Sequence, residues 1–157
     1  MTKAPASKPY DGPLTAHTGF WLRFVSNHVS GAFRQKLSEK GVAVAEWALM
    51  RSLHEHGAIA PSQLAVQLGI TRGGVTKIVD KLIVRSLVIR TPDAIDGRAH
   101  TLSLTATARR LVPVLAKLAD ENDQEWFGHL PPETIVALTG MLRGIVDHHQ
   151  LHAVPLE

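Results

Sequence analysis

Residues 61–105 constrain the possible fold more than any other part of this sequence. Two segments with apolar residues at helical spacing follow one another there, joined by a very short turn. In the first segment, Ser62 is a candidate helix N-cap, and Gly69 can end the helix in a left-handed conformation. Two helices connected in this way form a helix-turn-helix.

The second segment begins at Thr71, another N-cap candidate, and has two unlike faces. The face predicted to be buried carries Val75, Ile78, Val79, Leu82 and Ile83 at the spacing of one apolar stripe. The opposite face carries Arg72, Gly73, Thr76, Lys77, Asp80 and Lys81. Such a helix can dock on the protein with one side and offer hydrogen-bond donors with the other. The alternative is an ordinary solvated charged face.

Two short runs after this helix, Leu87–Arg90 and Thr101–Leu104, are typical of strands. The polar loop between them is too long for a two-residue hairpin turn. Asp96 is placed to hold the chain near Arg98 so that the guanidinium points outward. An arginine on an extended tip fits a narrow DNA minor groove, where negative potential is concentrated; the alternative is an exposed Asp96–Arg98 ion pair. The order of elements is that of a winged helix-turn-helix.

Residues 42–105 resemble the MarR family of bacterial transcription regulators. The fragments that carry the resemblance are Gln63–Ala65, Val75–Leu82, Leu87–Arg90, Asp96–Arg98 and Leu104–Thr105. The resemblance implies a homodimer that binds double-stranded DNA at a pseudo-palindromic operator near a promoter. It also implies a response to a small anionic or aromatic effector. We therefore predict a sequence-specific transcription regulator, acting as a ligand-responsive repressor.

The residues expected to contact DNA are Ser62, Gln63, Thr71, Arg72, Gly73, Gly74, Thr76, Lys77, Lys81, Arg90, Asp96 and Arg98. Arg72 is the candidate for a bidentate contact to guanine. Thr76 is expected to reach a base edge and Lys77 a phosphate. Gly73 and Gly74 weaken the start of the helix; either they let the backbone approach DNA closely, or they mark a slightly frayed turn.

The predicted fold is mainly α-helical with a small β wing, flanked by dimerisation helices at both ends. We expect a flexible tail over residues 1–13, an N-terminal dimerisation helix within 14–40, the winged helix-turn-helix over 41–105 and C-terminal dimerisation helices over 106–157. Residues 14–39 are expected to form one helix, and the residues before Pro61 a short strand. Thr105 should cap the helix that follows the wing, and prolines 131 and 132 should begin the last helix.

A ligand pocket between the first helix and the DNA-binding lobe, as the resemblance implies, would involve His17, Trp21, Phe24, His28 and Trp47. The alternative for these side chains is core and dimer packing. A metal-responsive regulator is another possible function, suggested by His148, His149 and His152 near the C-terminus. No cluster of carboxylates accompanies these histidines. We assign no metal and no cofactor.

Composition excludes several other classes of protein. The chain has 157 residues, a formal net charge of +3 and no cysteine, so disulfides and thiol redox sensing are excluded. No segment approaches the roughly 20 apolar residues of a membrane span, and we expect a cytoplasmic protein. Enzymatic motifs are lacking. The competing function is a winged-helix module that binds proteins and has no DNA target.

Overall fold

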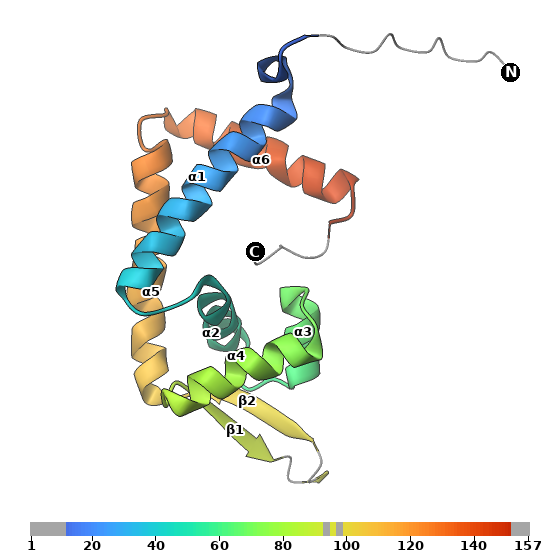
Figure 1. Ribbon diagram of the computed structural model, residues 1–157, viewed down its shortest axis with the longest axis vertical. Coiled ribbons are helices and arrows are strands. Elements are labelled where there is room, and N and C mark those ends of the chain that lie inside the picture. The colour runs from blue at the N-terminus through green and yellow to red at the C-terminus, as the bar shows by residue number, and fades with distance from the viewer. Residues whose placement is uncertain (1–11, 93–94, 97–98, 152–157) are drawn as a thin grey trace, which may run out of the picture.

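The computed structural model describes residues 12–92, 95–96 and 99–151. The elements are the short 3-10 helix η1 (Leu14–Ala16), α1 (Thr18–Glu39), α2 (Val44–His56), α3 (Pro61–Leu68), α4 (Arg72–Val84), β1 (Val88–Pro92), β2 (His100–Leu104), α5 (Ala106–Phe127) and α6 (Pro132–His148). In Figure 1, α2, α3, α4 and the β1–β2 hairpin form a lower lobe, and α1 and α6 lie in an upper arm. The long helix α5 joins the two. This mainly helical architecture with a small hairpin confirms the predicted fold class.

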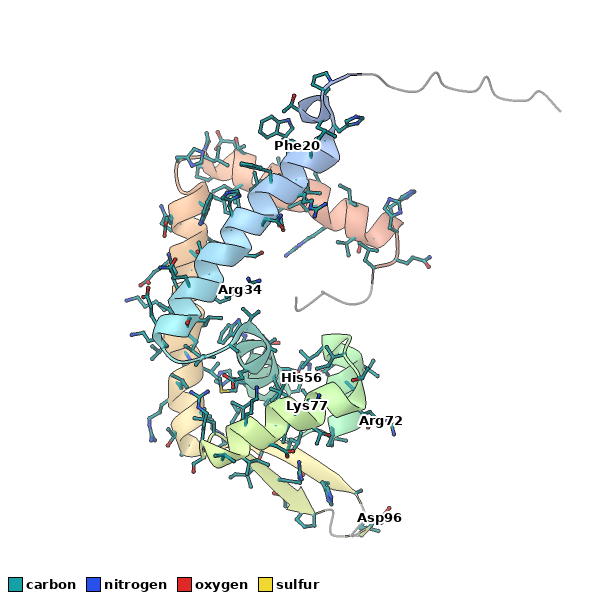
Figure 2. All side chains as sticks on the ribbon, viewed as in Figure 1. Phe20, Arg34, His56, Arg72, Lys77 and Asp96 are labelled. Atoms are coloured by element: carbon teal, nitrogen blue, oxygen red, sulfur yellow. The ribbon has the colours of Figure 1, made fainter. Side chains whose placement is uncertain are left out.

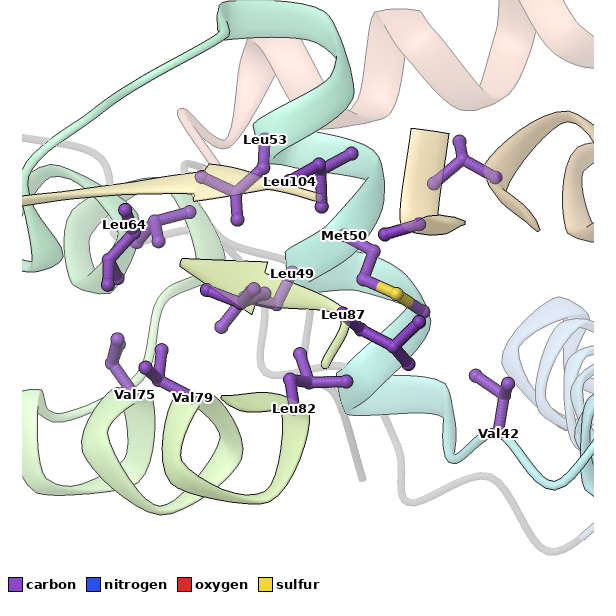
Figure 3. Packing of buried hydrophobic residues seen from close by; sticks show 14 of the residues in the cluster. Val42, Leu49, Met50, Leu53, Leu64, Val75, Val79, Leu82, Leu87 and Leu104 are labelled. Carbon is purple, nitrogen blue, oxygen red and sulfur yellow. The ribbon is translucent and has the colours of Figure 1, made fainter. Parts of the chain in front are cut away.

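One hydrophobic cluster holds the lower lobe together. Its members come from α2, α3, α4 and both strands, and it continues into α1 with Leu37 and into α5 with Ala108, Val112 and Leu115. Figure 3 shows Leu49, Met50, Leu53, Leu64, Val75, Val79, Leu82, Leu87 and Leu104 facing one another. The predicted apolar stripe of α4 supplies Val75, Val79 and Leu82, each at most 1% exposed. Burial of one side of α4 fixes which side remains available to a partner.

The turn between α3 and α4 forms as its sequence predicts. Gly69 adopts a left-handed conformation with φ 63°, and the N–H of Ile70 donates to the carbonyl of Ala65 at 3.1 Å. Thr71 is the N-cap of α4, because its Oγ1 accepts the N–H of Gly74 at 3.0 Å. The cap and the glycine together set the angle at which α4 leaves α3.

The predicted cap of α3 at Ser62 is wrong. The helix begins two residues earlier, at Pro61, with Ala60 as N-cap. Proline suits the first helical position because its φ is preset and it has no N–H to leave unpaired. Instead of a Ser62 cap, the side chain of Gln63 accepts the N–H of Ala60 at 3.1 Å. Ser62 is left exposed on the first turn.

The wing is an antiparallel hairpin in which Val88 pairs with Leu104 and Pro92 with His100. Strand β1 ends at Pro92, two residues after its predicted end at Arg90, and β2 begins at His100, one residue before its predicted start at Thr101. The expected third strand is reduced to one bridge between Ile59 and Leu102, whose backbones exchange hydrogen bonds of 3.1 and 2.8 Å. One residue pair therefore attaches β2 to the segment between α2 and α3.

In the upper arm, the first helical segment is divided rather than continuous, because His17 is extended between η1 and α1. Helix α5 runs through Pro113 without interruption and is capped by Thr105, as predicted. The amide of Asn122 on α5 donates to the carbonyl of Val29 at 3.2 Å and joins α5 to α1. Within the described residues, no helix has both the length and the apolar character needed to cross a bilayer.

Candidate nucleic-acid interface

The outer face of α4 carries unpaired positive charge. Arg72, Lys77 and Lys81 are exposed, and their side chains form no hydrogen bond or ion pair within the described part of the chain. Figure 2 shows Arg72 at the end of α4 that follows the turn. Lys77 and Lys81 lie on the face opposite the buried stripe, and Arg72 is exposed because it is the first residue of the helix. All three can therefore donate to an external acceptor while the helix stays packed.

The remaining predicted residues of this helix differ in how available they are. The hydroxyl of Thr76 donates to the carbonyl of Arg72 at 3.1 Å, and that of Thr71 is used as the cap. A Cβ added at Gly73 would meet only the Thr71 hydroxyl oxygen at 4.0 Å, whereas one at Gly74 would lie 3.4 Å from the same oxygen. Gly73 therefore leaves open space at the surface of the first turn.

Helix α3 contributes its first turn to the same region. A shallow groove of about 700 Å³ lies along α3 and the turn before α4, and Ser62, Gln63 and Arg72 all line it. Residues predicted separately from the two helices are therefore brought together at one surface. The groove runs along the side of the helix-turn-helix that faces solvent.

Arg90 on β1 is held against α4. Its guanidinium donates to the Asp80 carboxylate at 3.1 Å, and the two side chains are 40% and 59% exposed. An ion pair this exposed contributes less than about 1 kcal/mol to stability, but it links the wing to α4. Arg90 was expected from the sequence to contact DNA, and nothing in the sequence indicated Asp80 as its partner.

The wing tip is described only in part. Asp96 lies at the far end of the hairpin from α5 (Figure 2), and its carbonyl accepts the N–H of Ala99 at 2.9 Å. Arg98, predicted to enter the minor groove, lies outside the described residues, as does Gly97. The described strands nonetheless extend the tip away from the body of the lower lobe.

A second ion pair lies at the C-terminal end of α4, and no pattern in the sequence indicated it. Glu46, in the first turn of α2, accepts the N–H of Ala43 at 2.9 Å and the guanidinium of Arg85 at 3.0 Å through the same oxygen. Arg85 is the C-cap residue of α4. One carboxylate therefore caps α2 and binds the end of α4. The Glu46 side chain is only 11% exposed, so it is better shielded from solvent than Asp80.

The residues of the predicted ligand pocket are only partly brought together. Trp21, Phe24 and His28 follow one another along α1, with ring centroids 6.3 and 4.5 Å apart, and His17 lies just before that helix. Trp47 lies apart from them on α2, where it packs edge-on against Phe33 at 6.3 Å. The α1 rings also reach Trp126 of α5, since His28 lies 6.4 Å from it.

Two of the three C-terminal histidines lie within the described residues. The rings of His148 and His149 lie 4.9 Å apart, and His152 falls outside the described residues. Among the residues that the structure describes, no group of three or more histidine, cysteine, aspartate or glutamate side chains is placed to hold a metal ion.

A helix-turn-helix with a basic outer face, followed by a hairpin and carried on a long helical arm, defines a winged helix-turn-helix protein. Comparison with known proteins points to one family. The sequence model of the MarR family matches residues 43–100, which span α2 to the start of β2. This match, the curated relatives and the shared architecture agree in their similarity to MarR-type regulators.

Relatives of known name resemble the chain along most of its length. The transcriptional repressor NicR of Pseudomonas putida is 24% identical over 146 residues, which cover 91% of this chain and 92% of that protein. The structure of BpsR from Bordetella bronchiseptica, described as regulated in DNA binding by 6-hydroxynicotinic acid, is 25% identical with a TM-score of 0.75, covering 89% and 99%. A mutant of MarR from E. coli complexed with operator DNA is 21% identical with a TM-score of 0.72, covering 82% and 92%.

Proposed function

We propose that this chain is a homodimeric transcription regulator that places α4 in the major groove of a pseudo-palindromic operator. The observation that carries the proposal is that α4 buries one stripe while Arg72, Lys77 and Lys81 stay exposed, without an ion pair to any residue that the structure describes. In this arrangement, side chains from the first turns of α4 reach base edges. Arg72 reads guanine, and the two lysines neutralise phosphates.

The flanking contacts come from α3 and the wing. Ser62 and Gln63 lie on the first turn of α3, where helix amides favour phosphate oxygens. We expect Arg98 to enter the adjacent minor groove, with Asp96 holding the chain beside it, and Arg90 steadies the base of the wing through Asp80. Thr71, Gly73, Gly74 and Thr76 form the closest surface of the α4 start, with Gly73 allowing a close backbone approach.

Dimerisation through the arm is supported by exposed apolar side chains. Leu22 and Phe24 on α1 are 49% and 50% exposed, and Ile145 on α6 is 50% exposed. None of the residues of α6 is buried within its own chain. A patch of this kind usually marks an interaction surface, and a second copy would present the same faces. The two recognition helices would then enter major grooves about 34 Å apart.

We further propose that the regulator responds to an aromatic carboxylic acid and acts as a repressor. Support comes from the relatives, since NicR is named a repressor and BpsR is regulated by 6-hydroxynicotinic acid. A ligand that changes the distance between the two DNA-binding lobes of the dimer would prevent them from binding both half-sites at once, and the affinity for the operator would fall. The named relatives are regulators, which supports a non-enzymatic role at the bacterial chromosome, in the cytoplasm.

Selection of bound duplexes from a random library, followed by fluorescence anisotropy, tests the function. We expect enrichment of a pseudo-palindrome and an affinity that falls steeply with salt, with a log–log slope of roughly −0.9 per phosphate contacted. A chain that enriches no sequence and binds all duplexes with equal weakness would instead be a protein-interaction module.

A further inference from the structure

A small surface hollow of about 190 Å³ lies between α4 and the β1–β2 hairpin. Figure 1 shows the hairpin alongside α4, which packs against β1. The residues that line the hollow are Pro61 of α3, Val75, Thr76 and Val79 of α4, Arg90 of β1, and His100 and Leu102 of β2. Of these, His100 carries a titratable group that the DNA contacts proposed above do not use.

The register of the hairpin places His100 on the face of the wing that packs against α4. His100 pairs with Pro92, and Leu102 pairs with Arg90. Side chains alternate between the two faces along a strand, so His100 shares a face with Leu102, which is fully buried. His100 itself is half-buried. Its ring therefore lies next to the Arg90–Leu102 pair, on the same face of the hairpin.

A hydrogen bond fixes which ring nitrogen of His100 carries a hydrogen. Nδ1 lies 2.9 Å from the carbonyl oxygen of Ala99. Because a carbonyl oxygen can only accept, Nδ1 is the donor, and Nε2 of the neutral ring then has a lone pair and no hydrogen. An imidazole in water gains its second hydrogen at about pH 6.5. The charge state of the ring therefore decides whether Nε2 can donate to an anion.

We propose that protonated His100 donates from Nε2 to a phosphate of the operator DNA, in the backbone strand that separates the two grooves. This inference rests on the proposed function. With α4 in the major groove and the wing in the adjacent minor groove, that strand crosses the surface between them, where His100 lies. The hydrogen bond from the charged ring is charge-assisted, whereas the neutral ring turns a lone pair toward the phosphate.

The charged groups around His100 are compatible with an anion. Arg90 lines the same hollow and adds positive charge, although it also donates to Asp80 of α4. The lining residues from α3 and α4 are all uncharged. Neither Asp80 nor Asp96 of the wing tip lines the hollow, and no other carboxylate among the described residues does. A phosphate would therefore meet the protonated ring without a competing carboxylate in the hollow.

Fluorescence anisotropy of the full chain on its selected duplex, at pH 6 and pH 8 and at constant salt, tests this contact. We expect the affinity at pH 6 to be at least about tenfold higher, because each of two lobes gains about threefold. The slope of log affinity against log salt should also be steeper at pH 6 by about 1 to 2, since each lobe adds one charged phosphate contact.

Three variants separate His100 from the other eight histidines of the chain. His100→Gln offers a neutral donor at every pH, so both differences should be lost. His100→Lys is charged at both pH values, so its affinity at pH 8 should approach that of the wild-type chain at pH 6. His129→Gln is the matched control, because His129 is exposed and follows α5 at the end far from the wing. This control should keep the wild-type pH dependence, and urea unfolding at both pH values checks that all three variants fold.

Equal affinity of the wild-type chain at the two pH values would overturn the contact. A pH dependence in His100→Gln that matches the wild type would overturn it as well, and so would a His100→Lys chain that gains no affinity at pH 8. If the wild-type chain still selects a duplex in any of these cases, the proposed function stands and only the His100 contact is wrong. If it selects no duplex at either pH, the proposed function itself is wrong.

Discussion

Replacing Gly73 with alanine should make the protein more stable and weaken its binding to DNA. Gly73 is the second residue of α4, its φ is not positive, and an added Cβ would meet no atom closer than 4.0 Å. Alanine is favoured over glycine within a helix by about 0.5–1 kcal/mol. The free energy of unfolding should rise by about that amount, which corresponds to roughly 1–4 °C in melting temperature for a chain of this size.

The effect on DNA has a different cause. If the Gly73 backbone lies against the duplex, a methyl group there must push the helix outward, and we expect at least about a tenfold loss of affinity. Urea unfolding measures the stability, and fluorescence anisotropy on the selected duplex measures the affinity. Gly74→Ala is the comparison, and its gain in stability should be smaller because its Cβ would lie 3.4 Å from the capping oxygen of Thr71. A more stable Gly73→Ala protein with unchanged affinity would refute the close approach, and no stabilisation would refute an ordered first turn.

Two further predictions concern specificity and assembly. Arg72→Ala should reduce discrimination at one base pair by about 1–3 kcal/mol. Lys77→Ala should instead weaken binding evenly across sequences and reduce the slope of log affinity against log salt by about 1. Equal effects of the two variants on a panel of single-site operator variants would contradict the assignment of Arg72 to a base and Lys77 to a phosphate. Leu142→Glu places a charge on the apolar side of α6 and should give a monomer in analytical ultracentrifugation. The monomer should no longer bind both half-sites of the operator at once. A Leu142→Glu dimer that binds normally would show that this part of α6 lies outside the subunit contact.

The recognition helix was predictable because its determinants are local. Thr71 caps it, Gly69 ends the preceding helix, and Val75, Val79 and Leu82 repeat at the helical period, so a short window of sequence contains the whole signal. The Ser62 cap failed within the same stretch because two start signals compete there. Proline at the first helical position prevailed over a serine one residue later.

The interactions that connect the elements could not be read in this way. The Glu46–Arg85 pair joins residues 39 apart, and the Asp80–Arg90 pair joins a helix to a strand. Charged residues occur throughout the exposed surface, so nothing in the sequence singles out these pairs before the elements are packed. Trp47 shows the same limit, since the sequence left a ligand pocket and core packing both open and did not indicate that Trp47 packs against Phe33.

Because no residue of α6 is buried within its own chain, the stability of this helix should depend on the protein concentration. An amphipathic helix of 17 residues is marginal in water without packing on its apolar side. If a second copy supplies that packing, dilution below the dissociation constant should unravel α6 while the lower lobe persists. Backbone amides of residues 132–148 should then exchange with deuterium faster in dilute samples than in concentrated ones. At low protein concentration, the chain would therefore lose the ability to bind two half-sites at once while its winged helix-turn-helix lobe is still folded.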